Sequence, residues 1–374
     1  EDQQHTISAL RKLGTDIRVS GDDVEIKGRG GRFKAPDSPV FIGNSGVSAR
    51  LLAVLCALAD GRVVLDGTER MRTGRPIQDL IDAAKPLGIH MKSQGGNGYL
   101  PLLIDGGGIK GGETELRGDK SSQYFSAILL AAPYAQEDIR INTKGKLLSK
   151  PFLDITLDIM EQFGVNGENK DYKSFKVKAG QRYNAGEYNV EGDYSNSAYF
   201  FAAAAVTQGR VRVRNLRQDS PQGEARFLDF LEIMGCDVRK GENSVEVTGK
   251  PLKAIKADMG DYPDIVQPLA VVAAFAQGKS EFMNIAHLKY KECNRLEATA
   301  AELRKLGVEA EATEDSLIIN GGAVHGGEIE TYDDHRMAMS FSIAGLAAEG
   351  VIIRNPECVG KSFPDFYEKL DKLK

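Results

Sequence analysis

An internal repeat of about 73 residues constrains the fold of this chain more than any other feature. A short apolar strand, a small polar turn and an Ala-rich helix recur five times. The turns begin near Gly43, Gly118, Gly192, Gly260 and Tyr332, at intervals of 75, 74, 68 and 72 residues. A constant interval indicates that one supersecondary unit is repeated along the chain.

A second set of helices lies between the first. Sequences such as "LRKLG", "AKPLG" and "MEQFG" end in glycines at positions 14, 88, 164, 235 and 307, which are again 71 to 76 residues apart. Apolar residues in these helices follow helical spacing, as in Ile77, Leu80, Ile81 and Ala84. Each glycine stands where a helix ends and a positive φ is favoured, so we predict helix C-caps at these glycines.

Short hairpin-like stretches follow each second-set helix, for example "DIRVSGDDVEIKG" and "VEAEATEDSLIING". One unit is therefore β-α-β-α-β-β. The first-set helices, such as "FFAAAAV" and "LAVVAAFA", are apolar on most faces, which is typical of buried helices with sheets packed outside them. We expect an α/β (α+β) protein of two lobes with three units each, divided as residues 1–190 and 191–374. The chain opens inside a unit, whose first strand and helix do not occur in the sequence, and an N-terminal strand is expected to complete the last unit.

Composition excludes several classes of protein. The chain has 374 residues, a net charge of −5 and 41% hydrophobic residues. No apolar run reaches the ~18 residues of a membrane span, and from the acidic and polar start "EDQQHT" we expect no signal peptide. The four cysteines form no C-x-x-C and the five histidines have no metal-ligand spacing, so we expect a cytoplasmic protein without disulfides or metal. The acidic balance argues against nucleic-acid binding.

Basic residues lie near several predicted helix starts. A helix N-terminus attracts anions, yet Gly, Ser, Asn and Asp are also simply good N-caps. Arg336 falls in the first turn of a helix, where the helix dipole disfavours a cation. Lys291 and Arg295 in "KYKECNR" are predicted to share a helix face; the alternative is a surface helix with a Glu292–Arg295 pair. In a net-acidic protein, these cations favour a small polyanionic ligand.

Several ordered motifs then show that the chain resembles the 5-enolpyruvylshikimate-3-phosphate synthase family over essentially its whole length. These motifs are "GNSGVSAR", "RMRTGRPI", "GDKSSQYFSAILLAAPYA", "VEGDYSNSAYFFAAA", "DYPD", "KYKECNRL", "TYDDHRMAMSFS" and "GKSFPDF". The resemblance implies two three-unit lobes with the active site in the cleft between them. It also implies transfer of the enolpyruvyl group of phosphoenolpyruvate to the 5-hydroxyl of shikimate 3-phosphate, a step of the shikimate pathway to chorismate. It implies no cofactor, no membrane or nucleic-acid partner, a monomer, and inhibition by glyphosate.

The resemblance also implies roles for particular residues. Shikimate 3-phosphate is expected to contact Ser121, Ser122, Gln123, Ser149, Asp264 and Lys291. Phosphoenolpyruvate is expected to contact Asn44, Gly46, Arg75, Gln123, Arg295, Arg336 and Lys361. Asp264 is the candidate general base, and Lys291 and Glu292 are the other candidate catalytic residues. Which group acts as acid and which as base stays open.

Three positions depart from the family pattern. Val47 replaces a usual threonine, Phe152 a common tyrosine, and His287 lies where some members carry asparagine. The related UDP-N-acetylglucosamine enolpyruvyl transferases share the fold, but their loop cysteine has no counterpart in "RMRTGRPI". A protein that binds shikimate 3-phosphate without turnover is the other alternative.

Overall fold

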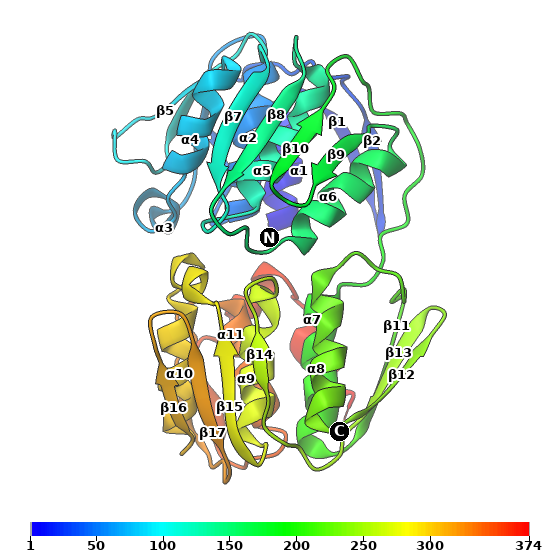
Figure 1. The fold of residues 1–374 in the computed structure, drawn as a ribbon, viewed down its shortest axis with the longest axis vertical. Helices are drawn as coiled ribbons and strands as arrows, with labels where there is room; N and C mark the ends of the chain where they lie inside the picture. The colour runs from blue at the N-terminus through cyan, green and yellow to red at the C-terminus, as the bar shows by residue number, and fades with distance from the viewer. Residues whose placement is uncertain (1, 374) are drawn as a thin grey trace. The chain divides into compact units, whose positions relative to one another are not determined.

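The chain divides into two compact units in a computed structural model that describes residues 2–373 (Figure 1). We call Glu1–Tyr188 unit 1 and Asn189–Lys374 unit 2. Each unit has its own hydrophobic core. Within residues 2–373, no helix has the length and apolar character needed to cross a membrane.

Unit 1 contains six α-helices, ten strands and three short 3₁₀ helices among its described residues. In chain order they are α1 (Asp2–Lys12), β1 (Asp16–Ser20), β2 (Asp23–Lys27), β3 (Val40–Phe41), α2 (Gly46–Leu55), η1 (Cys56–Leu58), β4 (Val63–Asp66), α3 (Glu69–Thr73), α4 (Gln78–Ala84), η2 (Lys85–Leu87), β5 (His90–Ser93), β6 (Leu102–Asp105), β7 (Gly112–Arg117), α5 (Gln123–Ala131), η3 (Ala132–Tyr134), β8 (Ile139–Lys144), α6 (Pro151–Gln162), β9 (Gly167–Lys170) and β10 (Ser174–Val177).

Unit 2 continues the same alternation. Its elements are α7 (Tyr194–Thr207), β11 (Arg210–Arg214), η4 (Gly223–Ala225), α8 (Arg226–Met234), β12 (Asp237–Gly241), β13 (Ser244–Thr248), β14 (Lys256–Asp258), η5 (Pro263–Ile265), α9 (Val266–Ala274), β15 (Gly278–Met283), η6 (Ala286–Tyr290), α10 (Arg295–Lys305), β16 (Glu309–Ala312), β17 (Leu317–Gly321), β18 (Gly327–Ile329), α11 (His335–Ala344), β19 (Val351–Ile353), η7 (Pro356–Lys361) and α12 (Phe366–Asp371).

Three four-stranded sheets confirm the predicted β-α-β-α-β-β unit. Their strand orders are β3-β4-β6-β5, β7-β8-β10-β9 and β14-β15-β17-β16. In each sheet the first two strands are parallel, and the last two form the antiparallel hairpin predicted after the second helix. The crossover between the parallel strands is the Ala-rich helix, so each repeat places the start of that helix next to the end of its first strand.

The first-set helices form the interior of both units, as predicted. In unit 1, α2 packs on α5; in unit 2, α7, α9 and α11 pack on one another. All nine residues of α9 are buried. Figure 1 shows the sheet of β11, β12 and β13 outside α7 and α8. Burial of these Ala-rich helices on most sides, with small side chains at their contacts, allows close helix packing.

All five predicted glycine caps are confirmed. Gly14, Gly88, Gly164, Gly235 and Gly307 have φ values of 88°, 74°, 84°, 114° and 79°. Glycine reaches this left-handed region without the steric cost that other residues meet. The glycines therefore end the second-set helices sharply enough for the hairpins to begin.

The strand predicted before α7 is absent, which corrects one copy of the repeat. Residues 184–193 form no strand, and the sheet that follows has only the order β11-β13-β12. A hydrogen bond of 2.6 Å from the Gly192 amide to the Asn215 carbonyl stands in place of a ladder. Val190 is 78% exposed, so this stretch gains little apolar burial from joining a sheet.

Candidate active site

Arg295 is the centre of a buried ion cluster in unit 2. Its side chain is 1% exposed. The guanidinium donates to both oxygens of Asp334 at 2.8 and 3.2 Å, to Glu292 at 2.7 Å and to Asp264 at 3.2 Å. The planar fork of arginine suits such contacts better than the single ammonium of lysine. One cation thereby joins carboxylates from three separate segments.

Asn294 explains where Arg295 lies. Its side chain accepts a hydrogen bond from the Glu297 amide, so α10 begins at Arg295. Lys291 precedes this cap and has an extended backbone, with φ −87° and ψ −156°. The prediction that Lys291 and Arg295 share a helix face is therefore wrong. The alternative of a surface helix is also wrong, because the Glu292–Arg295 pair is present but buried.

Asp334 fixes the start of α11. It is 0% exposed and accepts a hydrogen bond from the Arg336 amide at 2.9 Å. The two residues before it, Tyr332 and Asp333, have φ values of 54° and 56°. This tight turn places Arg336 in the first helical turn, as predicted. The Arg336 side chain then pairs with Asp264 at 3.0 Å and donates to the Tyr199 hydroxyl at 3.2 Å.

Lys361, at the end of η7, completes the cluster: its Nζ forms a salt bridge of 2.5 Å with Oε1 of Glu292. Three cations, Arg295, Arg336 and Lys361, thus face the three carboxylates Asp264, Glu292 and Asp334. Lys291 adds a positive field at Asp264. The cluster carries one positive charge beyond neutrality, which suits an anionic ligand.

The charge state of Asp264 follows from these neighbours. Burial alone raises the pKa of Asp264, but Arg336, Lys291 and Arg295 outweigh burial and hold that pKa below its usual range. Asp264 is therefore ionised at neutral pH. An anionic ligand that draws Arg336 or Arg295 toward itself weakens this effect and makes Asp264 a stronger base.

A second polar cluster lies in unit 1, at the start of α2. Arg75 donates to the Asn44 carbonyl at 3.0 Å, and Arg50 donates to the Gln123 side chain at 2.6 Å. Gly46 leaves the space that these side chains occupy: a Cβ on Gly46 would lie 2.3 Å from Arg75 Nη2 and 3.1 Å from Arg50 Nη1. The "GNSG" turn therefore allows two buried arginines to approach the helix N-terminus. The capping interpretation also holds, because Ser45 accepts from the Ser48 amide at 3.2 Å.

The predicted serines lie on two loops of unit 1. Ser121 Oγ accepts from the Gln123 amide at 3.3 Å where α5 begins, and Ser122 is buried beside it. Ser149 is buried before α6 with φ 57°. The two loops are joined by a hydrogen bond of 3.0 Å from the Leu148 amide to the Gly118 carbonyl. Backbone packing thus couples the serine that precedes α6 to the pair that precedes α5.

Sequence reasoning assigned no site role to five residues of these clusters or their surroundings, although His287 was noted as a departure from the family pattern. Tyr199 and Asp334 bond the predicted arginines directly, Arg50 holds Gln123, and His287 and Glu224 are buried close to Asp264 in charge interactions. Burial, then the charge of Asp264, raise the pKa of Glu224 to about 8. Asp334 could have been predicted from the sequence. It precedes a predicted helix as an N-cap candidate and stands two residues before Arg336, so it would be expected to lie close to that arginine. Arg50 and Tyr199 lie inside the motifs "GNSGVSAR" and "VEGDYSNSAYFFAAA", and His287 lies two residues before "KYKECNRL", but no motif shows which side chains these residues contact. Glu224 lies outside the motifs.

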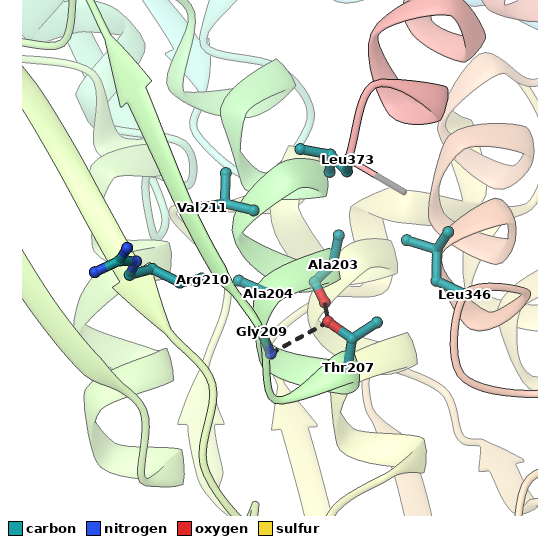
Figure 2. Close-up of a pocket in the computed structure, with 8 residues that line it drawn as sticks. All are labelled: Ala203, Ala204, Thr207, Gly209, Arg210, Val211, Leu346 and Leu373. Atoms are coloured by element: carbon teal, nitrogen blue, oxygen red, sulfur yellow. Dashed lines mark hydrogen bonds between the residues drawn. The ribbon is translucent and has the colours of Figure 1, made fainter.

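A separate pocket of about 230 Å³ in unit 2 contains none of the predicted site residues (Figure 2). Ala203, Ala204 and Thr207 of α7 line it together with residues of β11, Leu346 and Leu373. Figure 2 shows Thr207 tied to its own helix, with 2.7 Å from its hydroxyl to the Ala203 carbonyl. Between residues 2 and 373, no group of three or more His, Cys, Asp and Glu side chains is arranged to hold a metal ion.

Repeated α/β units, an arginine–carboxylate cluster in unit 2 and a pair of buried arginines in unit 1 are features that suit small anionic ligands. The family model for EPSP synthase (3-phosphoshikimate 1-carboxyvinyltransferase) matches residues 1–370. The chain belongs to this family.

Relatives and solved structures agree. A 3-phosphoshikimate 1-carboxyvinyltransferase of Nostoc punctiforme is 41% identical over 376 residues, covering 100% of this chain and 88% of the relative. One from Photobacterium profundum is 42% identical over 378 residues with the same coverage. The structure of EPSP synthase from Acinetobacter baumannii superimposes with a TM-score of 0.82 at 28% identity, over 99% of this chain and 86% of that one. The resemblance and the fold class predicted from the motifs are confirmed.

Proposed function

We propose that this chain transfers the enolpyruvyl group of phosphoenolpyruvate to the 5-hydroxyl of shikimate 3-phosphate and releases phosphate. The observation that carries the proposal is the family match over residues 1–370. The cluster around Arg295 supports it, because a carboxylate and a phosphate on one small donor need several fixed cations. A cytoplasmic location and a monomeric state stay predictions.

The reaction is an addition followed by an elimination. In the addition, the acceptor oxygen bonds to C2 of the donor, its proton leaves, and a proton reaches the methylene carbon. In the elimination, the new methyl group loses a proton and the bond from C2 to the phosphate oxygen breaks. The enzyme must therefore both remove and deliver protons near one carbon atom.

The proposed catalytic groups are Asp264, Lys291 and Glu292. Asp264 accepts the proton of the 5-hydroxyl, because the neighbouring cations keep it ionised and its basicity rises when the donor competes for its arginines. Glu292 exchanges the proton at the methylene carbon, and Lys361 and Arg295 stabilise its ionised form. Lys291 lies near the acceptor hydroxyl and the bridging oxygen.

The binding roles follow the same scheme. For the acceptor phosphate, neutral hydroxyl donors near the start of a helix suit a dianion, and we assign Ser121, Ser122 and Ser149 to it. Gln123, which Arg50 orients, contacts both substrates. For the donor we assign Asn44, Gly46, Arg75, Arg295, Arg336 and Lys361.

Phosphate release from phosphoenolpyruvate tests the function directly. The full chain is assayed with shikimate 3-phosphate, with UDP-N-acetylglucosamine and with no acceptor. Release only with shikimate 3-phosphate supports the proposal. Release with UDP-N-acetylglucosamine contradicts it. Binding of shikimate 3-phosphate without release identifies a non-catalytic binding protein.

A further inference from the structure

Three side-chain hydroxyls connect α1 to the N-cap of α2. Thr6 Oγ1 lies 2.7 Å from Ser48 Oγ, and Ser48 Oγ lies 2.7 Å from Ser45 Oγ. Ser45 and Ser48 are 0% and 1% exposed. Bulk water does not reach the two serines, so each of their hydroxyl protons needs an acceptor inside the protein.

The direction of these hydrogen bonds follows from the backbone at one end. Thr6 Oγ1 donates to the Asp2 carbonyl at 3.0 Å, and a carbonyl oxygen can only accept. Because a hydroxyl has a single proton, Ser48 must donate to Thr6, and Ser45 must then donate to Ser48. Ser45 Oγ also accepts from the Ser48 amide at 3.2 Å. We call Ser45, Ser48 and Thr6, hydrogen-bonded in this one order, the hydroxyl chain.

The hydroxyl chain begins in the turn that holds Arg75. Ser45 directly follows Asn44, whose carbonyl accepts from Arg75 Nη1 at 3.0 Å. It directly precedes Gly46, where a Cβ would collide with the same guanidinium. The conformation of Ser45 therefore affects the position of Arg75 through both of its neighbours in the sequence.

The hydroxyl of Thr6 is needed to keep this order. Without it, Ser48 would donate to Ser45, and the proton of Ser45 would lose its acceptor in a place that water does not reach. A buried donor without an acceptor costs more free energy than the hydrogen bond itself contributes. The Ser45 side chain would turn to another acceptor and leave the Ser48 amide, so α2 would lose its N-cap.

Resting on the proposed function, we propose that Thr6 is a positioning residue for phosphoenolpyruvate, whose hydroxyl orders the two serines and thereby holds the turn that fixes Arg75. Thr6 itself touches neither substrate in this scheme. The effect is specific to the donor, because the serines assigned to the acceptor phosphate lie on other loops, before α5 and α6.

Steady-state kinetics of closely matched variants test the proposal. Thr6→Val removes the hydroxyl at nearly constant shape and is expected to raise the KM for phosphoenolpyruvate about fivefold, the effect of one lost neutral hydrogen bond, with less than about a twofold rise for shikimate 3-phosphate. Thr6→Ser keeps the hydroxyl and is expected to stay close to the unmodified chain. Thr207→Val is the matched control in unit 2: it loses the same kind of bond to the carbonyl four residues earlier and should change neither KM.

A double-mutant cycle tests whether Thr6 acts through Ser48. Ser48→Ala interrupts the hydroxyl chain in its middle and should raise the same KM. Thr6→Val should then add nothing in the Ser48→Ala background. Additive effects would show that Thr6 acts by another route and would overturn the proposal. If Thr6→Val does not fold, Ser48→Ala decides: a raised KM for phosphoenolpyruvate alone supports the hydroxyl chain, and an unchanged one overturns it.

Nuclear magnetic resonance gives a readout that needs no turnover. The Nε–H signals of the arginine side chains are recorded in the ¹⁵N-labelled full chain, and Arg75→Lys assigns the signal of Arg75. We expect Thr6→Val to move this signal in the ligand-free chain, and Thr207→Val to leave it in place. A change in overall stability alone would not move one arginine signal selectively.

The outcomes separate this inference from the function on which it rests. Turnover with an unchanged KM for phosphoenolpyruvate in Thr6→Val, or with equal rises in both KM values, overturns the inference and leaves the function intact. If the unmodified chain shows no turnover with shikimate 3-phosphate, the proposed function fails. In that case a moved Arg75 signal in Thr6→Val still supports the positioning of Arg75, and an unmoved signal overturns it as well.

Discussion

Replacement of Gly46 by alanine should weaken donor binding while leaving the fold intact. The new Cβ would lie 2.3 Å from Arg75 Nη2 and 2.6 Å from Arg75 Cζ. Distances below about 3 Å between these atoms cannot be tolerated, so the guanidinium must move. The backbone itself does not oppose alanine, because Gly46 begins α2 and has no positive φ.

The expected rise in the KM for phosphoenolpyruvate follows from the hydrogen bond that Arg75 would lose. Its hydrogen bond of 3.0 Å to the Asn44 carbonyl fixes the guanidinium. A hydrogen bond to a charged group contributes about 1.5–3 kcal/mol, which corresponds to about a 10- to 150-fold rise in the KM for phosphoenolpyruvate. Alanine favours the helix by up to about 1 kcal/mol, so the free energy of unfolding should change little.

Steady-state kinetics measure the KM for phosphoenolpyruvate, and urea unfolding of the same preparation measures the free energy of unfolding. Gly28→Ala is the matched control, since a Cβ there meets nothing within 4 Å and its φ is not positive. An unchanged KM for phosphoenolpyruvate in Gly46→Ala would refute the assignment of Arg75 to the donor. A loss of several kcal/mol in unfolding free energy would refute the claim that the collision is local.

Three further predictions concern charge and strain. Arg295→Met leaves the buried Asp334 and the half-buried Asp264 and Glu292 without their shared cation, and we expect urea unfolding to show a loss of about 3–5 kcal/mol; a loss below 1 kcal/mol would show that the pairs are weak. Because the pKa of Glu224 is raised to about 8, the folded chain holds a proton that the unfolded chain releases above about pH 4.3. Stability should therefore fall toward pH 8 by at most about 1.4 kcal/mol per pH unit, and Glu224→Gln should show a smaller fall between pH 5 and 8; equal falls would contradict the raised pKa. Ser149 has φ 57°, so Ser149→Gly should unfold at higher urea concentration than Ser149→Ala by about 1 kcal/mol, while both raise the KM for shikimate 3-phosphate; an unaffected KM would remove Ser149 from the acceptor site.

The repeat and its helix ends could be predicted from sequence because local physics decides them. Only glycine enters the left-handed region easily, so the five glycines at one spacing defined the ends of the second-set helices. Burial of the Ala-rich helices followed from their composition alone. In these elements, local preference and tertiary structure agree.

The errors and omissions lie where distant residues decide the outcome. The strand predicted before α7 failed because Val190 gains no burial there. The helix predicted across "KYKECNR" failed because the Asn294 cap, one residue before Arg295, sets the start of α10. The contact of Tyr199 with Arg336 spans 137 residues, and no local pattern reports such a distance. The motifs pointed to the cations and to the carboxylates Asp264 and Glu292, and the fold adds Asp334 and the Tyr199 hydroxyl as the groups that hold Arg295 and Arg336.

The shared use of Arg295 has a consequence for protein engineering. Three segments, which carry Asp264, Glu292 and Asp334, meet on one side chain. A substitution in any of them changes the environment of the other two, so effects of single mutations in these segments will not add. A library that varies one segment at a time would discard combinations that work only when two segments change together. Altered donor specificity is therefore best sought by varying all three segments in the same library.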